Sequence, residues 1–172
     1  VREHQEEQRH YSPHFGLVEA RVRAIDDPRC LGALWRIGFE DAPERSGELC
    51  VFELFGREVN GHGARVGMGI HPFGDPSLRE DFAMVEAHLD PLEFHSYAAA
   101  WQPGITSFYI DDELVAEVDQ APDYPLQLML NLYEFADEPD ATDPAATSTA
   151  PAQATAYPKE FAVDFVRGYR LA

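Results

Sequence analysis

The feature that most constrains the fold is a succession of short apolar runs separated by turn residues. No segment keeps a helical period over three turns, and 85–93 is predicted as either a helical turn or a further short strand. Runs of this length and spacing are typical of two packed antiparallel sheets, so the sequence predicts an all-β sandwich. The runs, rich in Val, Leu, Ile, Phe and Tyr, are 15–25, 31–39, 47–55, 64–71, 94–101, 105–111, 113–119, 125–133 and 161–170.

The connections between the runs predict how they are organised. Asp111-Asp112 lies between two runs and is predicted to form a hairpin turn, because short acidic side chains tolerate the backbone of a tight turn. The segment 137–157, rich in Ala, Pro, Thr and Asp, is predicted as a flexible exposed loop. The run after it is expected to pair far back in the chain. We expect one domain over 1–172, with 1–10 as a lead-in.

The charge excludes some partners. Thirteen Lys and Arg residues face 31 Asp and Glu residues, for a formal net charge of −18. Such a chain repels phosphate backbones and anionic membranes, so nucleic acid and membrane partners are not expected. No apolar run approaches the roughly 20 residues of a membrane span. A neutral polymer suits this surface better than a sulfated or uronic one.

One short run carries two carboxylates. In Glu48-Leu49-Cys50-Val51-Phe52-Glu53, strict alternation sends Glu48 and Cys50 to one face of a strand and Glu53 to the other. One bulged residue at Val51 or Phe52 would return Glu53 to the face of Glu48. Two carboxyl groups brought together in that way suit the nucleophile and the proton donor of a retaining glycosidase.

The order of the runs resembles glycoside hydrolase family 16, the laminarinase, lichenase and agarase group of concanavalin A-like jelly rolls. The likeness covers roughly residues 11–172, but several tens of residues that precede the first motif in the family are not in this sequence. The resemblance implies a jelly-roll sandwich with a concave glycan cleft. The stretches that carry it are Phe15 to Arg21 ("G-x-F-E-A-R"), Ala33 to Gly38 ("A-F-W-L-L-G"), Ser46 to Glu53 ("G-E-I-D-x-x-E"), Phe94 to Trp101, Phe108 to Asp111, Tyr124 to Tyr133 and Val163 to Arg167.

The resemblance also implies roles. Glu48 would be the nucleophile and Glu53 the general acid and then base, acting on β-1,3 or β-1,4 linkages in a neutral polysaccharide. Cys50 stands where the family has an aspartate. The thiol either leaves the enzyme impaired, as in a lectin-like carbohydrate-binding sandwich, or replaces a protonated aspartate by donating weakly to Glu48. A plain structural sandwich is a third hypothesis.

Further side chains are candidates for substrate contact. Alternation puts Trp35 and Arg36 on opposite faces, and we expect Arg36 in the cleft and Trp35 in the core. Trp101 is either a core residue, which we favour, or a stacking platform for a sugar ring. The remaining cleft candidates are Asn131, Tyr133 and His71.

No metal or cofactor is expected from the residue pattern, because the seven histidines show no spacing of metal ligands. The resemblance alone implies one exception, a structural calcium at Asp164. The two cysteines leave one disulfide between Cys30 and Cys50 possible by count. The sequence leaves the compartment and the oligomeric state open, although members of the family are often secreted.

Overall fold

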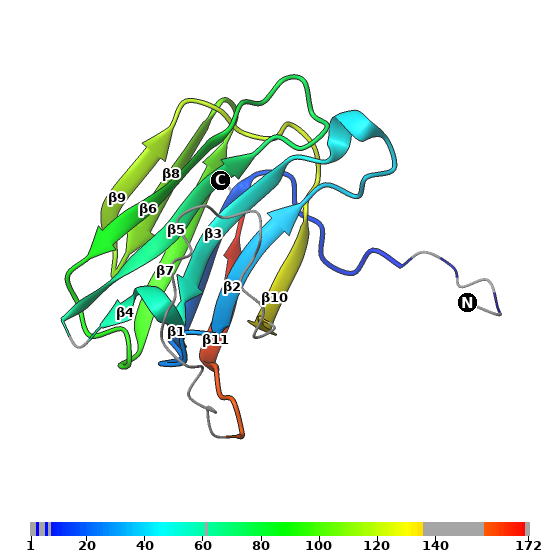
Figure 1. The fold of residues 1–172 in the computed structure, drawn as a ribbon. Coiled ribbons are helices and arrows are strands. Elements are labelled where there is room, and N and C mark those ends of the chain that lie inside the picture. The colour runs from blue at the N-terminus through cyan, green and yellow to red at the C-terminus, as the bar shows by residue number, and fades with distance from the viewer. Residues whose placement is uncertain (1–2, 4–5, 7, 61, 136–156, 171–172) are drawn as a thin grey trace, which may run out of the picture.

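The computed structural model describes residues 3, 6, 8–60, 62–135 and 157–170. Two antiparallel sheets pack face to face in it (Figure 1). All nine predicted runs are strands, within a few residues at their ends. The strands are β1 (Gly16–Arg23), β2 (Cys30–Ile37), β3 (Glu48–Phe55), β4 (Val59–Asn60), β5 (Gly63–His71), β6 (Asp81–Ala87), β7 (His95–Gln102), β8 (Ile105–Ile110), β9 (Glu113–Val118), β10 (Gln127–Glu134) and β11 (Ala162–Tyr169).

Two strands lie outside the nine predicted runs. β4 is a two-residue strand, and β6 overlaps the ambiguous segment 85–93 only at its start. β6 pairs with β5 at an edge, and most of its side chains are at least partly exposed. The apolar signal there is weak because an edge strand buries little of its surface.

The strand order is non-local, as predicted for the last run. The first sheet has the order β11-β1-β7-β8-β9, and the second has β10-β2-β3-β5 with β4 and β6 both paired to β5. β11 pairs with β1, so the last strand of the chain lies beside the first (Figure 1). The predicted hairpin at Asp111-Asp112 joins β8 to β9, and both residues have positive φ, 47° and 66°.

The core fills the space between the two sheets. Alternate residues of β1, namely Val18, Ala20 and Val22, meet Leu49, Val51, Phe52 and Leu54 of β3 in one buried cluster. The ring of Phe52 contacts that of Tyr97 on β7, with centroids 5.1 Å apart. Because side chains alternate across a strand, burying this side of β3 turns its other side chains away from the core.

Three further expectations concern features outside the strands and the core. The predicted flexible loop 137–157 falls outside the described residues except for Tyr157. Within the described part of the chain, no helix has the length and apolar character that a membrane crossing needs. Cys30 and Cys50 are both free and buried, so the disulfide that the count allowed is not formed.

Candidate active site

A bulge in β3 sets the direction of its acidic side chains. Opposite β2, Cys50 pairs with Trp35 and Phe52 with Leu34, which leaves Val51 as the extra residue. Opposite β5, Cys50 pairs with Gly69 and Glu53 with Gly67, so three steps on β3 match two on β5. The predicted bulge is therefore confirmed, and Val51 and Phe52 both enter the core.

The bulge brings Glu48, Cys50 and Glu53 to one face of the second sheet, the face turned away from the core. We call it the Glu48 face. Directly paired residues of antiparallel strands share a face, so the pairing identifies its other members. They include Trp35 on β2, His71 on β5, and Met129, Asn131 and Tyr133 on β10.

The start of β3 is fixed by hydrogen bonds outside the sheet ladder. The backbone N–H of Gly47 donates to the Tyr124 hydroxyl at 2.8 Å, and that hydroxyl donates to Asp75 at 2.6 Å. A side chain at Gly47 would lie 2.4 Å from Leu78 and 2.5 Å from the same hydroxyl. The backbone immediately before Glu48 is thus held in place, which limits where its carboxyl can go.

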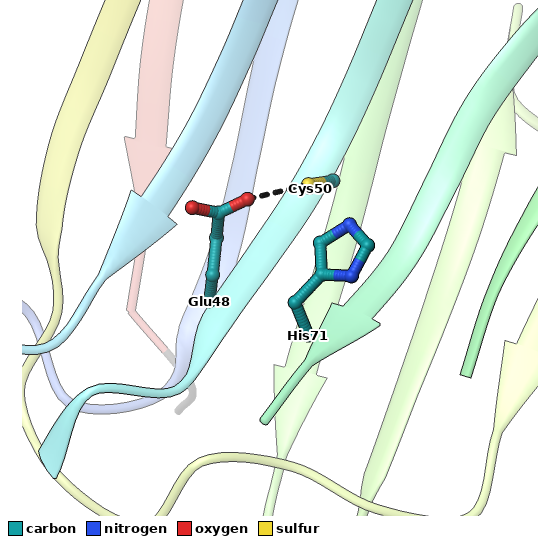
Figure 2. Close-up of side chains that lie close together, drawn as sticks. All are labelled: Glu48, Cys50 and His71. Carbon is teal, nitrogen blue, oxygen red and sulfur yellow. Dashed lines mark hydrogen bonds between the residues drawn. The ribbon is translucent and has the colours of Figure 1, made fainter. Parts of the chain in front are cut away.

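Cys50 is a hydrogen-bond donor to Glu48. The thiol Sγ lies 3.0 Å from Oε1 of Glu48 (Figure 2). Burial raises the pKa of the Cys50 thiol far above its ordinary range, and the charge and hydrogen bond of Glu48 raise it further. The thiol therefore stays neutral and keeps its proton toward Glu48, the geometry of the second alternative that the sequence left open.

Glu53 has the electrostatic environment of a proton donor. Burial is the largest cause that raises the pKa of its carboxyl, and the negative charge of Glu48 adds to it. His71 acts in the opposite direction and lowers the pKa of Glu53. A carboxyl whose pKa is raised by burial beside a second carboxylate is the pattern of an acid and nucleophile pair.

His71 lies directly opposite Glu48 in the β3–β5 ladder. Its Nδ1 is 2.7 Å from Oε1 of Glu80, and its ring stacks on Phe82 with centroids 4.6 Å apart. Glu80 and Phe82 were missed from the sequence because they lie between the predicted run 64–71 and the ambiguous segment 85–93. The structure thus brings His71 to the face on which the sequence analysis placed it.

Trp35 and Arg36 are on the faces opposite to those expected. Trp35 is half-buried on the Glu48 face, where its Nε1 donates to Oδ1 of Asn131 at 2.6 Å. Arg36 pairs with the core residue Leu49 and is only 1% exposed. The predicted cleft position of Arg36 is wrong, because Leu34 and Arg36 share a strand face and Leu34 belongs to the core.

Arg36 is tolerated in the core by its contacts with an aromatic ring. Its guanidinium lies 4.6 Å from the centroid of Trp101, and Nη2 donates to the carbonyl of Pro13 at 3.3 Å. Its Nε has no hydrogen-bond partner among the described residues. Trp101 itself is buried, and its Nε1 donates to the carbonyl of Pro122. The favoured prediction of Trp101 as a core residue is confirmed, and the alternative of a stacking platform for sugars is wrong.

Asn131 and Tyr133 both lie on the Glu48 face, as expected. The amide nitrogen of Asn131 is buried and has no hydrogen-bond partner among the described residues. Such an unpaired buried donor costs stability, and the side chain of Asn131 contributes to the face through its hydrogen bond with Trp35. Tyr133 is exposed, near the Glu53 end of the face.

The surroundings of Asp164 do not fit a calcium ion. Its Oδ2 accepts a hydrogen bond from Nη1 of Arg21 at 2.8 Å, across the β1–β11 pair. Calcium needs six to eight oxygen ligands, and the position beside this carboxylate already holds a cation. No step below involves calcium.

Two positions of β5 beside the carboxyl groups of the Glu48 face are occupied by glycine, so no side chain stands there. A Cβ on Gly67 would lie 2.5 Å from the Phe82 ring and 3.0 Å from Cβ of Glu53. Gly69 has φ of 143°, and a Cβ there would meet the carbonyl of Asp81 at 2.2 Å. Only glycine fits these two positions, which lie opposite Glu53 and Cys50.

These observations define a class, a jelly-roll β-sandwich with a paired carboxylate motif on an outer sheet face. The family model "Glycosyl hydrolases family 16" matches residues 7–150. The chain belongs to glycoside hydrolase family 16. Comparison with curated protein sequences gives no significant match.

Solved structures share the fold. The GlcNAcα1-4Gal-releasing endo-β-galactosidase from Clostridium perfringens is 24% identical with a TM-score of 0.73, over 96% of this chain and 40% of that one. The catalytic domain of an endo-1,3-β-glucanase (laminarinase) from Thermotoga petrophila is 19% identical with a TM-score of 0.69, over 93% and 65%. A laminarinase from Flavobacterium sp. is 20% identical with a TM-score of 0.69, over 93% and 69%. The chain therefore spans two fifths to about two thirds of the length of these structures.

Proposed function

We propose that this protein hydrolyses β-1,3 or β-1,4 linkages of a neutral glucan or galactan with retention of configuration. The observation that carries the proposal is the Val51 bulge, which puts Glu48 and Glu53 on one face while burial raises the pKa of Glu53. Membership of family 16 and the glucanase and galactosidase neighbours support the choice of substrate class.

The reaction takes two displacements. The Glu48 carboxylate attacks the anomeric carbon while the Glu53 carboxyl gives its proton to the glycosidic oxygen, so the C–O bond breaks and an alcohol leaves. Glu53, now a carboxylate, takes a proton from water, and the water oxygen displaces Glu48 from the anomeric carbon. Two inversions restore the original configuration, and both carboxyl groups return to their starting states.

Other residues of the Glu48 face have positioning roles in this proposal. The Cys50 thiol donates to Glu48 and limits rotation of its carboxyl. The indole of Trp35, held by Asn131, offers an apolar surface for a sugar ring. Tyr133 extends the same surface toward the strand end.

The test is release of reducing sugar from laminarin, lichenan and agarose. Glu53→Gln should lower turnover about 10²- to 10⁴-fold, the usual contribution of a general acid, and Glu48→Ala at least as much. Azide should restore turnover to Glu48→Ala with an inverted glycosyl azide product, because a small anion can replace the missing nucleophile. A folded wild type that hydrolyses no β-glycan, or a Glu48→Ala variant with full activity, would refute the proposal.

A second function is favoured by one observation. Cys50 is a neutral thiol where the family motif has an aspartate, and a thiol is the weaker hydrogen-bond partner. We infer from this that the alternative is a carbohydrate-binding sandwich with impaired chemistry. Calorimetric binding of laminarin or lichenan oligosaccharides without release of product, in wild type and Glu53→Gln alike, would favour it over hydrolysis.

A further inference from the structure

Three different metal-ligating groups meet on the Glu48 face. A carboxylate oxygen of Glu48, the sulfur of Cys50 and a ring nitrogen of His71 all lie within 4.8 Å of one another (Figure 2). Glu48 and Cys50 come from β3, and His71 comes from the paired strand β5. Among the residues that the structure describes, no other group of three such side chains is this compact.

The ligand set fits zinc. Zn²⁺ is bound by cysteine sulfur at about 2.3 Å and by histidine nitrogen and carboxylate oxygen at about 2.0 to 2.2 Å, in tetrahedral geometry. Those bond lengths put neighbouring ligand atoms about 3.3 to 3.6 Å apart. Sγ and Oε1 are 3.0 Å apart and no separation among the three atoms exceeds 4.8 Å, so side-chain rotations of about 1 Å bring them to these distances. A water molecule would be the fourth ligand. A sulfur ligand disfavours Ca²⁺ and Mg²⁺, which take oxygen ligands.

Glu80 and Phe82 hold the imidazole of His71 in a fixed orientation. Nδ1 of His71 is occupied by Glu80 at 2.7 Å, and stacking on Phe82 fixes the plane of the ring. Figure 2 shows the other ring nitrogen turned toward Cys50. Metal-ligating histidines commonly make this second contact to a carboxylate, which sets the tautomer and raises the basicity of the ligating nitrogen.

We propose that Glu48, Cys50 and His71 bind one Zn²⁺ ion reversibly, and that the bound ion inhibits the enzyme. Binding breaks the Cys50–Glu48 hydrogen bond and forms Zn–S, Zn–N and Zn–O bonds. The thiol proton, and the second ring proton of His71 when the imidazole is charged, are released to solvent. The ion takes the carboxylate that would attack the sugar, so a glycan and zinc exclude each other. Metal binding stands by itself, whereas the inhibition rests on the proposed hydrolase function.

The first test is a titration of the full chain with Co²⁺ as a spectroscopic substitute for Zn²⁺. One equivalent should produce the charge-transfer absorption of a Co²⁺–thiolate bond, and Zn²⁺ should abolish it by displacement. Cys50→Ser and His71→Gln should lose the absorption, and Glu80→Gln should weaken binding roughly 10- to 100-fold. Circular dichroism verifies that each variant is folded.

Matched controls come from the same chain. Cys30 is the second buried free cysteine, and His62 is an exposed histidine in the turn between β4 and β5. Cys30→Ser and His62→Asn should bind Co²⁺ as the wild type does. Absence of the thiolate absorption in folded wild type, or its persistence in Cys50→Ser, would overturn the site.

The second test separates this inference from the proposed function. If wild type hydrolyses laminarin, one bound equivalent of Zn²⁺ should stop the reaction and EDTA should restore it. Hydrolysis that continues with Zn²⁺ bound would overturn the inhibition. If no β-glycan is hydrolysed, the cobalt spectrum still decides the metal site, and only the proposed function fails.

Discussion

Replacing Cys50 by aspartate should raise turnover at least tenfold. The Cys50 thiol donates to Glu48 across 3.0 Å, and an aspartic acid at this buried position would donate an O–H instead. A hydrogen bond to a charged group contributes about 1.5 to 3 kcal/mol, and a thiol is a weaker donor than a hydroxyl. The substitution should therefore strengthen the interaction by roughly 1 to 2 kcal/mol, and about 1.4 kcal/mol corresponds to a tenfold change in rate.

The gain should appear when Glu48 leaves the sugar. A stronger donor stabilises the carboxylate that forms as the covalent intermediate is hydrolysed, so the second displacement is accelerated. The aspartic acid is neutral while it donates, so it adds no negative charge beside Glu53 and should not raise the pKa of the proton donor further. The alkaline limb of the pH–rate profile should therefore stay where it is in wild type.

The assay is release of reducing sugar from laminarin or lichenan across pH, with initial rates for wild type, Cys50→Asp and Cys50→Ser. Cys30→Ser controls for loss of a buried thiol away from the Glu48 face. Turnover in Cys50→Asp that stays within twofold of wild type, in a folded protein that binds the glycan, would refute the reasoning. It would show that the Cys50 thiol already stabilises the Glu48 carboxylate as well as an aspartic acid would.

Three further predictions concern Glu53, Arg36 and Asn131. Because the pKa of Glu53 is raised in the folded state, its ionisation costs stability as pH rises above the value of about 4.3 in an unfolded chain, and the cost is complete above the folded pKa. Denaturant unfolding should therefore show Glu53→Gln gaining stability over wild type at pH 7 to 8 but not near pH 4, and a difference independent of pH would contradict this. Arg36→Met should lower the free energy of unfolding by less than about 1 kcal/mol or raise it, since a buried charge with few hydrogen bonds is replaced by apolar volume. Arg36→Ala should lower it by about 3 kcal/mol, because it leaves a cavity beside Trp101. Equal losses in the two variants would be inconsistent with this account. Asn131→Ala should raise KM roughly tenfold with kcat little changed, because it removes the hydrogen-bond partner that orients the Trp35 indole. Leu130→Ala on the opposite face of β10 should leave KM unchanged.

The strands and the carboxylate motif were predictable because their signals are local. Alternating apolar residues bounded by turn residues mark a strand whatever it pairs with, and the Glu48 to Glu53 spacing required one bulged residue to bring both acids to one face. β6 was missed for the corresponding reason, since an edge strand with half-exposed side chains has almost no alternation to detect.

Which of Trp35 and Arg36 enters the core could not be predicted from local sequence patterns. Alternation states that neighbours face opposite ways, and residue type then favours the tryptophan for the core. The structure has the reverse arrangement, because the register pairs Arg36 with Leu49 and sets its guanidinium over Trp101, a residue 65 positions further along the chain. The contact with the distant Trp101 ring offsets the cost of burying the Arg36 charge. No residue pattern within β2 could have predicted that contact.

The sequence by itself determined that this chain forms a β-sandwich with two acids in one strand, because strand periodicity is a property of consecutive residues. Only the tertiary structure decided what surrounds those acids. His71 reaches Glu48 and Cys50 through the pairing of β3 with β5, and Asn131 reaches Trp35 through the pairing of β10 with β2. The ligand cluster and the substrate surface both depend on the register between strands, which long-range packing selects and the spacing of residues does not record.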